Sequence, residues 1–168
     1  MSLLACTDVD YRADGTARAA LLLFGGWRVP SEVGGRIHRA QAVAPYEPGA
    51  FARRELPCLL PLLTPLVGHL EAVIIDGYVT LDGNGRPGLG WALYEALGRA
   101  VPVVGVAKTA FRGSPHAGPV ERGGTRALYV TAAGLEARAA ATLVRDMAGE
   151  YRVPTLLRRV DRACRTAP

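Results

Sequence analysis

Three carboxylates occupy positions in the chain that would suit a metal centre. Asp8 lies in the first apolar stretch, Asp76 ends the apolar run "EAVIID", and Glu55 follows the turn "PYEPG". Ligands of open α/β sheets bind at the carboxyl ends of parallel strands, so Asp8 and Asp76 would meet there if their strands are neighbours. Clustered carboxylates repel one another unless a proton or a hard divalent ion such as Mg²⁺ intervenes. The alternatives, an exposed strand position for Asp8 and a turn residue for Asp76, stay open on spacing alone.

The chain contains one lysine, Lys108, against 19 arginines. It directly follows the apolar run "VPVVGVA", where a lysine could contact a phosphate as a compact point charge or position a metal-bound water. The other interpretation is a strand end whose side chain extends into solvent. Because arginine serves at every other basic position, the single lysine favours a site that needs an ammonium group.

A proline-rich turn opens the segment "PYEPGAFARRE" (45–55). Pro45, Pro48 and Gly49 would stiffen this turn and fix the direction of Tyr46. An aromatic ring held in this way could wedge between bases or stack on one. Equally, Tyr46 could cover the core where a loop joins a helix, and the residues alone do not separate the two interpretations.

A glycine-rich segment, "YVTLDGNGRPGLG" (78–90), follows Asp76. It lacks the Lys-Ser/Thr pair of a phosphate-binding P-loop and the full spacing of a dinucleotide-binding loop. We therefore expect a flexible or substrate-lining loop, in which Arg86 is a candidate phosphate contact.

The 168 residues are 49% hydrophobic, which indicates a globular chain and one domain spanning residues 1–168. No apolar run reaches the ~18–20 residues of a membrane span, and the N-terminus lacks the basic segment of a signal peptide. Three widely spaced cysteines fit neither a disulfide framework nor a zinc site, so we expect free thiols and a cytoplasmic protein. The net charge of +5 is compatible with a polyanionic partner without requiring one.

The apolar pattern predicts the elements that position these residues. Three strands joined by short glycine-containing turns suggest an antiparallel meander, and the later strands alternate with helices, which implies parallel crossovers. The predicted strands cover 3–12, 17–24, 34–44, 71–77, 101–108 and 126–134, and the predicted helices cover 50–66, 91–100, 135–149 and 153–165. Pro57 and Pro61 should kink or restart the first helix. The predicted fold class is therefore α/β, a mixed sheet with helices on both faces.

Taken in order, these motifs resemble the endonuclease V family of deaminated-base repair nucleases, which has a ribonuclease H-like fold. The similar segments are "TDVDY" (7–11), "PYEPGAFARRE" (45–55), "VIIDG" (73–77), "VPVVGVAKT" (101–109) and "YRVPTLLRRVDRA" (151–163). The resemblance implies a metal-dependent endonuclease that hydrolyses a phosphodiester near an inosine in DNA or RNA.

The resemblance also implies roles for individual residues. It makes Asp8, Glu55 and Asp76 the ligands of Mg²⁺, for which Mn²⁺ substitutes, and it makes Lys108 the active-site lysine. Tyr46 becomes the wedge that separates strands. The residues expected to contact nucleic acid are Tyr46, Pro48, Gly49, Gly77 and Arg86. A monomer is the favoured state.

This chain departs from the family pattern in several places, of which two concern the base pocket and the metal site. The family follows its third carboxylate with Gly-x-Gly and a His-Pro-Arg run, whereas here Tyr78 and Val79 replace part of that base-pocket turn. Asp161 stands where the family often has a histidine, and it is a candidate additional carboxylate of the metal site. Two alternative functions follow. One is a homologue that binds nucleic acid with weakened catalysis, and the other is a ribonuclease H-like nuclease for a different lesion or structure.

Overall fold

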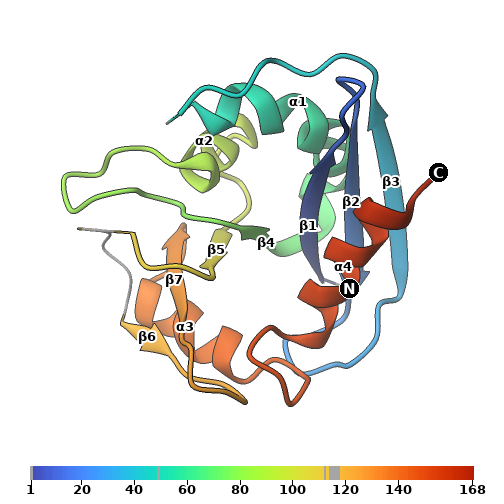
Figure 1. Cartoon of the computed structure of the whole chain (residues 1–168). Coiled ribbons are helices and arrows are strands. Elements are labelled where there is room, and N and C mark those ends of the chain that lie inside the picture. Colours follow the sequence, from blue (N-terminus) through green and yellow to red (C-terminus); the bar gives the residue numbers. More distant parts are fainter. Residues whose placement is uncertain (1, 49, 112, 114–117) are drawn as a thin grey trace.

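The computed structural model describes residues 2–48, 50–111, 113 and 118–168, within which seven strands form one mixed sheet (Figure 1). The strands lie in the order β3-β2-β1-β4-β5-β7-β6. Their bounds are β1 Leu3–Tyr11, β2 Ala17–Phe24, β3 Gly34–Ala40, β4 Leu70–Asp76, β5 Val103–Ala107, β6 Pro119–Val120 and β7 Leu128–Ala133. The α-helices are α1 Phe51–Leu63, α2 Leu89–Ala96, α3 Ala137–Arg145 and α4 Thr155–Thr166, and a short 3₁₀ helix, η1, spans Thr64–His69.

The first three strands form the predicted antiparallel meander. β1 pairs with β2 from Leu4 opposite Phe24 onward, and β2 pairs with β3. Asp14 closes the turn between β1 and β2, because its Oδ1 accepts hydrogen bonds from the amide and the hydroxyl of Thr16 at 3.0 and 2.6 Å. The third strand ends at Ala40, earlier than the apolar pattern predicted.

β4 runs parallel to β1, and β5 runs parallel to β4, so three neighbouring strands end at the same edge of the sheet. Thr7 pairs with Ile75, which sets Asp8 level with Asp76. Asp76 in turn pairs with Val106 of β5. The strand of Asp8 and the strand of Asp76 are therefore neighbours, the condition under which their carboxylates were expected to meet.

β7 runs antiparallel to β5, unlike the parallel direction that alternation with helices would give. The described part of the segment between β5 and β7 contains no helix, and it includes β6, which pairs antiparallel with β7. A parallel neighbour needs a long crossover, usually a helix, whereas a chain that returns directly pairs in the antiparallel sense.

α1 continues through Pro57 and Pro61, so the helix does not restart at either residue. Each proline removes one backbone donor from the helix. The apolar face of α1, which includes Leu59 and Leu63, is buried in the core. Tertiary packing of such a face supplies most of the stability of a helix in a protein, and here it offsets the lost hydrogen bonds.

Helices cover both faces of the sheet, as predicted (Figure 1). α3 and α4 pack on the face that carries Cys6 and Ile74, and α1 and α2 pack on the other face. Because side chains two residues apart on a strand share a face, Asp8 and Asp76 leave the sheet on the side of α4. None of the helices in the described ranges is long and apolar enough to cross a bilayer.

Candidate metal centre and nucleic-acid-binding site

The pairing of β1, β4 and β5 brings Asp8, Asp76 and Lys108 together. Neighbouring strands lie about 4.8 Å apart, and the register sets Asp8 beside Asp76. Lys108 directly follows β5, and its Nζ lies 3.4 Å from Oδ2 of Asp76. All three residues line one narrow hollow, which Leu157 and Val160 of α4 close from the other side. The lysine therefore ends a strand, and its ammonium group contacts a carboxylate of the cluster.

Glu55 joins the same cluster from α1, the helix on the other face of the sheet. Burial and the negative charges of Asp8 and Asp76 raise the pKa of Glu55 to about 7. Glu55 and Asp76 line the same pocket, and the strand register sets Asp76 beside Asp8. The structure thus groups the three acidic residues that the sequence singled out.

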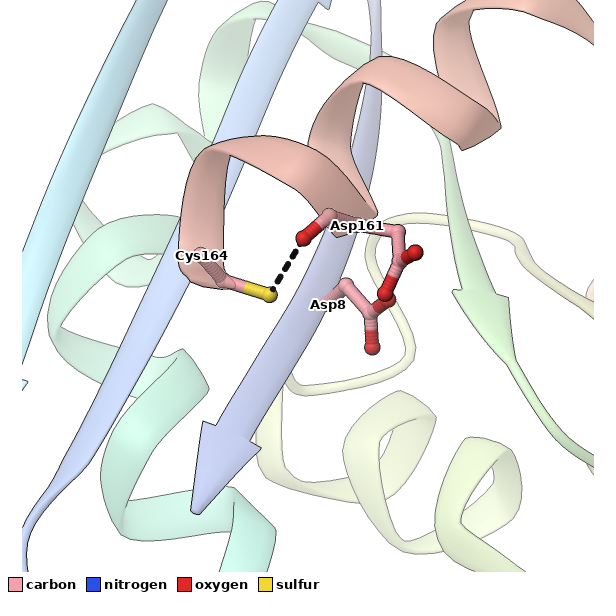
Figure 2. A group of neighbouring side chains, drawn as sticks. All are labelled: Asp8, Asp161 and Cys164. Atoms are coloured by element: carbon pink, nitrogen blue, oxygen red, sulfur yellow. Dashed lines mark hydrogen bonds between the residues drawn. The ribbon is translucent and has the colours of Figure 1, made fainter. Parts of the chain in front are cut away.

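Asp161 of α4 adds a fourth carboxylate to the group (Figure 2). Oxygen atoms of Asp8 and Asp161 and the Sγ atom of Cys164 all lie within 4.8 Å of one another. Arg165 holds Asp161 through an ion pair of 2.7 Å between Nε and Oδ1. Arg12 anchors the end of α4, because its Nη2 donates to the carbonyl of Cys164 at 3.2 Å. These contacts fix Asp161 beside Asp8 of β1.

Cys164 borders the cluster, although the sequence analysis assigned it no role there. Its Sγ donates to the main-chain oxygen of Asp161 at 3.1 Å, as the dashed line in Figure 2 marks. Burial and the charge of Asp8 raise the pKa of the thiol to about 12, so it stays protonated at neutral pH and is a poor ligand for a hard cation. The sequence feature that could have identified Cys164 as a neighbour of the cluster is its spacing of three residues from Asp161. On a helix this spacing places both side chains on one face.

Crowded negative charge is most evident at Asp8. Burial and the charge of Asp76 raise the pKa of Asp8 to about 7, although the amide of Val9 donates to its Oδ1 at 2.9 Å. Burial acts to raise the pKa of Asp161, but hydrogen bonds from Arg165 and Asp8 outweigh it and lower that pKa. In the metal-free cluster Asp8 therefore holds a proton more readily than Asp161 does. An all-oxygen cluster with excess negative charge has the donor set that a hard divalent ion prefers.

The metal-free protein is expected to lose stability as the pH rises. Asp8 and Glu55 have pKa values of about 7 in the fold, against about 4 in an unfolded chain. The folded state therefore binds more protons, and the stabilisation is complete below pH ~4 and is lost as the pH rises through 7. In EDTA, calorimetry should record a Tm lower by about 5 °C at pH 8 than at pH 5. Glu55→Gln should flatten this dependence, and a Tm that rises over the same range would contradict it.

A pocket of about 450 Å³ opens beside the cluster, and Glu55, Asp76 and Lys108 contribute to its lining. The remaining lining is mainly apolar and includes Gly77, Tyr78, Leu81, Leu89 and Phe111. A cavity of this size, mostly apolar with a few charged groups at one part of its lining, is typical of a site for a small planar ligand or a nucleobase.

Tyr78 ties together two loops of this pocket. Its hydroxyl donates to the carbonyl of Thr109 at 2.6 Å and accepts from the amide of Phe111 at 2.9 Å. Gly77 lines the pocket, as its expected contact with nucleic acid requires. Arg86 does not line it, because this exposed residue belongs to a turn in which its amide donates to Oδ1 of Asp82 at 3.1 Å.

Tyr46 lies in the turn before α1 and is 57% exposed. The guanidinium carbon of Arg54 lies 5.9 Å from the ring centre of Tyr46 and 3.7 Å from that of Tyr11. The exposure favours the interpretation of Tyr46 as a contact for a partner over that of a residue covering the core. Pro48 is exposed in the same turn, whereas Gly49 lies outside the described residues.

Gly105 of β5 provides the space in which the loop after Asp76 packs on the sheet. A Cβ atom at this position would lie 2.5 Å from the oxygen of Gly77 and 3.0 Å from the amide of Val79. That amide donates to Oγ1 of Thr131 at 2.8 Å, so the loop has no freedom to retreat without losing a buried hydrogen bond. The glycine thus positions one wall of the pocket.

Gly105→Ala is expected to displace this loop and to lower the free energy of unfolding by about 2 kcal/mol, the usual cost of overpacking a core. Urea unfolding monitored by circular dichroism measures the change. Gly83→Ala is the matched control, because a Cβ atom there meets nothing within 4 Å. Equal midpoints for the two variants would show that the loop can move at no cost.

Sequence comparison relates this chain to the endonuclease V family. The family model for endonuclease V matches residues 1–138. Endonuclease V of Xanthomonas axonopodis pv. citri is 38% identical over 125 residues, which cover 72% of this chain and 50% of that protein. Endonuclease V of Thermus thermophilus is 33% identical over 122 residues, which cover 71% of this chain and 52% of that protein. The chain therefore spans about half the length of these curated relatives.

Solved structures share the fold, including α4, which lies beyond the residues that the family model matches. Human endonuclease V has a TM-score of 0.79 at 22% identity, over 98% of this chain and 83% of that one. Endonuclease V of Streptomyces avermitilis has a TM-score of 0.77 at 24% identity, over 99% and 81%. Endonuclease V of Ciona intestinalis, with a TM-score of 0.78 at 15% identity over 98% and 84%, was solved with a DNA containing an inosine followed by a ribo-adenosine. The fold is thus the expected ribonuclease H-like one, and by its sequence the chain belongs to the endonuclease V family.

Proposed function

We propose that this protein is a metal-dependent endonuclease that hydrolyses a phosphodiester bond near an inosine in DNA or RNA. The observation that carries the proposal is the convergence of four carboxylates and the single lysine beside a pocket of about 450 Å³. The family of the chain, and the inosine-containing DNA bound by the Ciona protein, support the same chemistry. We take residues 1–168 to act as one domain and as a monomer.

The cofactor that fits the cluster is Mg²⁺, with Mn²⁺ as a substitute, because every ionised donor in it is a carboxylate. Asp8, Glu55 and Asp76 would hold one or two ions, with Asp161 as an additional ligand. When bound, such an ion activates a coordinated water and neutralises the charge that develops on the phosphate. Arg165 keeps Asp161 ionised and aimed at Asp8 through its ion pair of 2.7 Å.

Lys108 would bind the phosphate as a compact point charge. Its contact of 3.4 Å with Asp76 holds the ammonium group at the edge of the cluster, where the phosphate must lie to reach the metal. A flexible lysine can follow the phosphate as its geometry changes, and its three donors are not confined to one plane.

Recognition would use the turn before α1 and the pocket beside the cluster. Tyr46, with Pro48 next to the same turn, would insert beside a distorted base, and the extruded base would enter the pocket past Gly77 and Tyr78. Insertion of an aromatic ring compensates part of the stacking that a base loses when it leaves the duplex.

The decisive experiment is a cleavage assay with the purified protein on strands that carry a single inosine, in DNA and in RNA. Matched strands with adenosine at that position are the control. We expect cleavage near the inosine that requires Mg²⁺ or Mn²⁺ and stops in EDTA. If no inosine strand is cut in either metal, the substrate assignment fails, and binding without cleavage would support the non-catalytic alternative.

A different lesion or nucleic-acid structure is the second candidate substrate, and the hydrogen bonds of Tyr78 in the pocket favour it. The hydroxyl of Tyr78 already occupies the carbonyl of Thr109 and the amide of Phe111, two main-chain groups that could otherwise bind the edge of a base. A panel of mismatched, flapped and uracil-containing strands, assayed beside inosine, separates the two candidates.

We place the protein in the cytoplasm and assign it to nucleic-acid repair. The cysteines Cys6, Cys58 and Cys164 are all free and buried in the fold, which suits a reducing compartment. Labelling the thiols in cells before and after denaturation would test the assignment, since the denatured protein should then expose three reduced thiols.

A further inference from the structure

A second hollow, of about 370 Å³, shares Lys108 with the pocket beside the metal cluster but no other described residue. Asp161 of the cluster also lines it. The other contributors include Tyr151, Arg152 and Arg158, which belong to the first turn of α4 and the segment before it. The hollow therefore continues the candidate active-site groove along α4, away from the walls that form the base pocket.

Tyr151 and Arg158 form an exposed platform at this hollow. The guanidinium carbon of Arg158 lies 4.5 Å above the centre of the Tyr151 ring. Tyr151 is nevertheless 55% exposed. Among the described residues the guanidinium of Arg158 has no hydrogen-bond or ion-pair partner, so its donors are available to a ligand. A stacked Tyr–Arg pair offers a flat surface for a base and a charge for a phosphate.

The segment that carries Tyr151 is held in place by buried hydrogen bonds. Arg122 is 8% exposed, and its guanidinium donates to the carbonyls of Met147 at 2.9 Å, Gly149 at 2.8 Å and Tyr151 at 3.3 Å. A buried arginine whose donors are bound in this way fixes the backbone it contacts. The platform is therefore built into the fold before any ligand arrives.

Arg152 connects the platform to the cluster. Its guanidinium donates to the carbonyl of Ala127 at 2.7 Å and to the carbonyl of Lys108. Three cationic side chains thus border the hollow, while the charge of Asp161 is matched by its ion pair with Arg165. The net charge of the hollow is positive, which complements a phosphodiester backbone.

We propose that this hollow binds the substrate strand on the side of the cleaved bond opposite to the base pocket, with one base stacked on Tyr151 and its phosphate held by Arg158. The proposal rests on the proposed function, because it assumes that the strand crosses the metal cluster at Lys108. Its consequence is that the enzyme contacts its strand at two places. One place binds the extruded base, and the other binds an ordinary nucleotide beyond the cleaved bond. Base–aromatic stacking is tolerant of sequence, so this second contact would set affinity and register without selecting a base.

The test uses fluorescence anisotropy with the full chain carrying Asp76→Asn, so that strands are bound without being cut. Two series of inosine-containing single strands are shortened one nucleotide at a time, one series from the 5′ end and the other from the 3′ end. Tyr151→Ala and Arg158→Ala should each weaken binding of the longest strand about 10-fold. In one series this loss should disappear once the strand is too short to reach the hollow, whereas in the other series it should persist. Tyr151→Phe should bind like the parent, because it keeps the ring.

Arg162→Ala is the matched control, since Arg162 is an exposed arginine of the same helix outside the hollow. Losses that depend on strand length equally in both series, or that equal the loss of Arg162→Ala, would overturn the proposal and indicate general attraction to phosphate. No loss in either series would overturn it as well. Because binding is measured without turnover, this outcome is distinct from a failed cleavage assay, which would remove the proposed function but leave a length-dependent strand contact standing.

Discussion

Asp76→Asn is expected to abolish metal-dependent cleavage, lowering kcat by about 10³-fold or more, while the affinity for the uncut strand stays within about twofold. The substitution keeps the shape of the side chain but removes a charge from the point where β4 and β5 end beside Asp8 of β1. It also removes the ionic partner that holds Lys108 at 3.4 Å. Cleavage should therefore be lost by weakened metal binding and by a displaced lysine together.

Single-turnover kinetics over a range of Mg²⁺ concentrations measures this effect, with anisotropy for the uncut strand. Glu71→Gln is the matched control, because Glu71 is an exposed carboxylate near the opposite end of the same strand. A variant at Asp76 that cleaves at the rate of the Glu71 variant would show that the cluster is not the metal centre. Full recovery at high Mg²⁺ would instead assign Asp76 to metal affinity alone.

The strand-end part of the site could be predicted from the sequence because it depends on local pattern alone. Asp76 and Lys108 each end a short apolar run, and parallel strands that are neighbours place such ends at one edge of a sheet. The direction of β7 could not be predicted in the same way. It depends on the path of the chain between β5 and β7. The residues described there form no crossover helix, and the glycines and prolines of this segment obscure the apolar pattern of the sequence.

The helical part of the site depends on how helices dock, which no local pattern encodes. Glu55 was marked in the sequence only by its place after a proline-rich turn, and Asp161 was reached through family resemblance. Both lie near Asp8 only because α1 and α4 pack on opposite faces of the sheet. The role of Arg12 in anchoring α4 spans more than 150 residues of chain and has no sequence signal. Arg86, by contrast, was selected by its glycine-rich context, but it is exposed and does not line the pocket, although its neighbour Pro87 does.

Lys108→Arg is expected to lower kcat by about 30-fold, although it keeps the charge, and to leave the free energy of unfolding within about 0.5 kcal/mol of the parent. The side chain is 46% exposed, so its replacement creates no cavity and buries no new group. The guanidinium group is wider and planar, and it would extend past Asp76 into the space where metal, water and phosphate must fit. A shift of the main chain that would compensate is opposed by Arg152, which binds the carbonyl of Lys108.

Lys108→Met separates the two contributions of this residue, because methionine keeps the length of the side chain and removes its charge. If the phosphate needs the charge, the methionine variant should be slower than the arginine variant, with a loss of about 10²–10³-fold. If shape is the stronger requirement, the two variants should be about equally slow. Rapid-quench measurements of the cleavage step, with Tm as the control for folding, distinguish these cases. An arginine variant as fast as the parent would mean that the single lysine of this chain reflects composition and not chemistry.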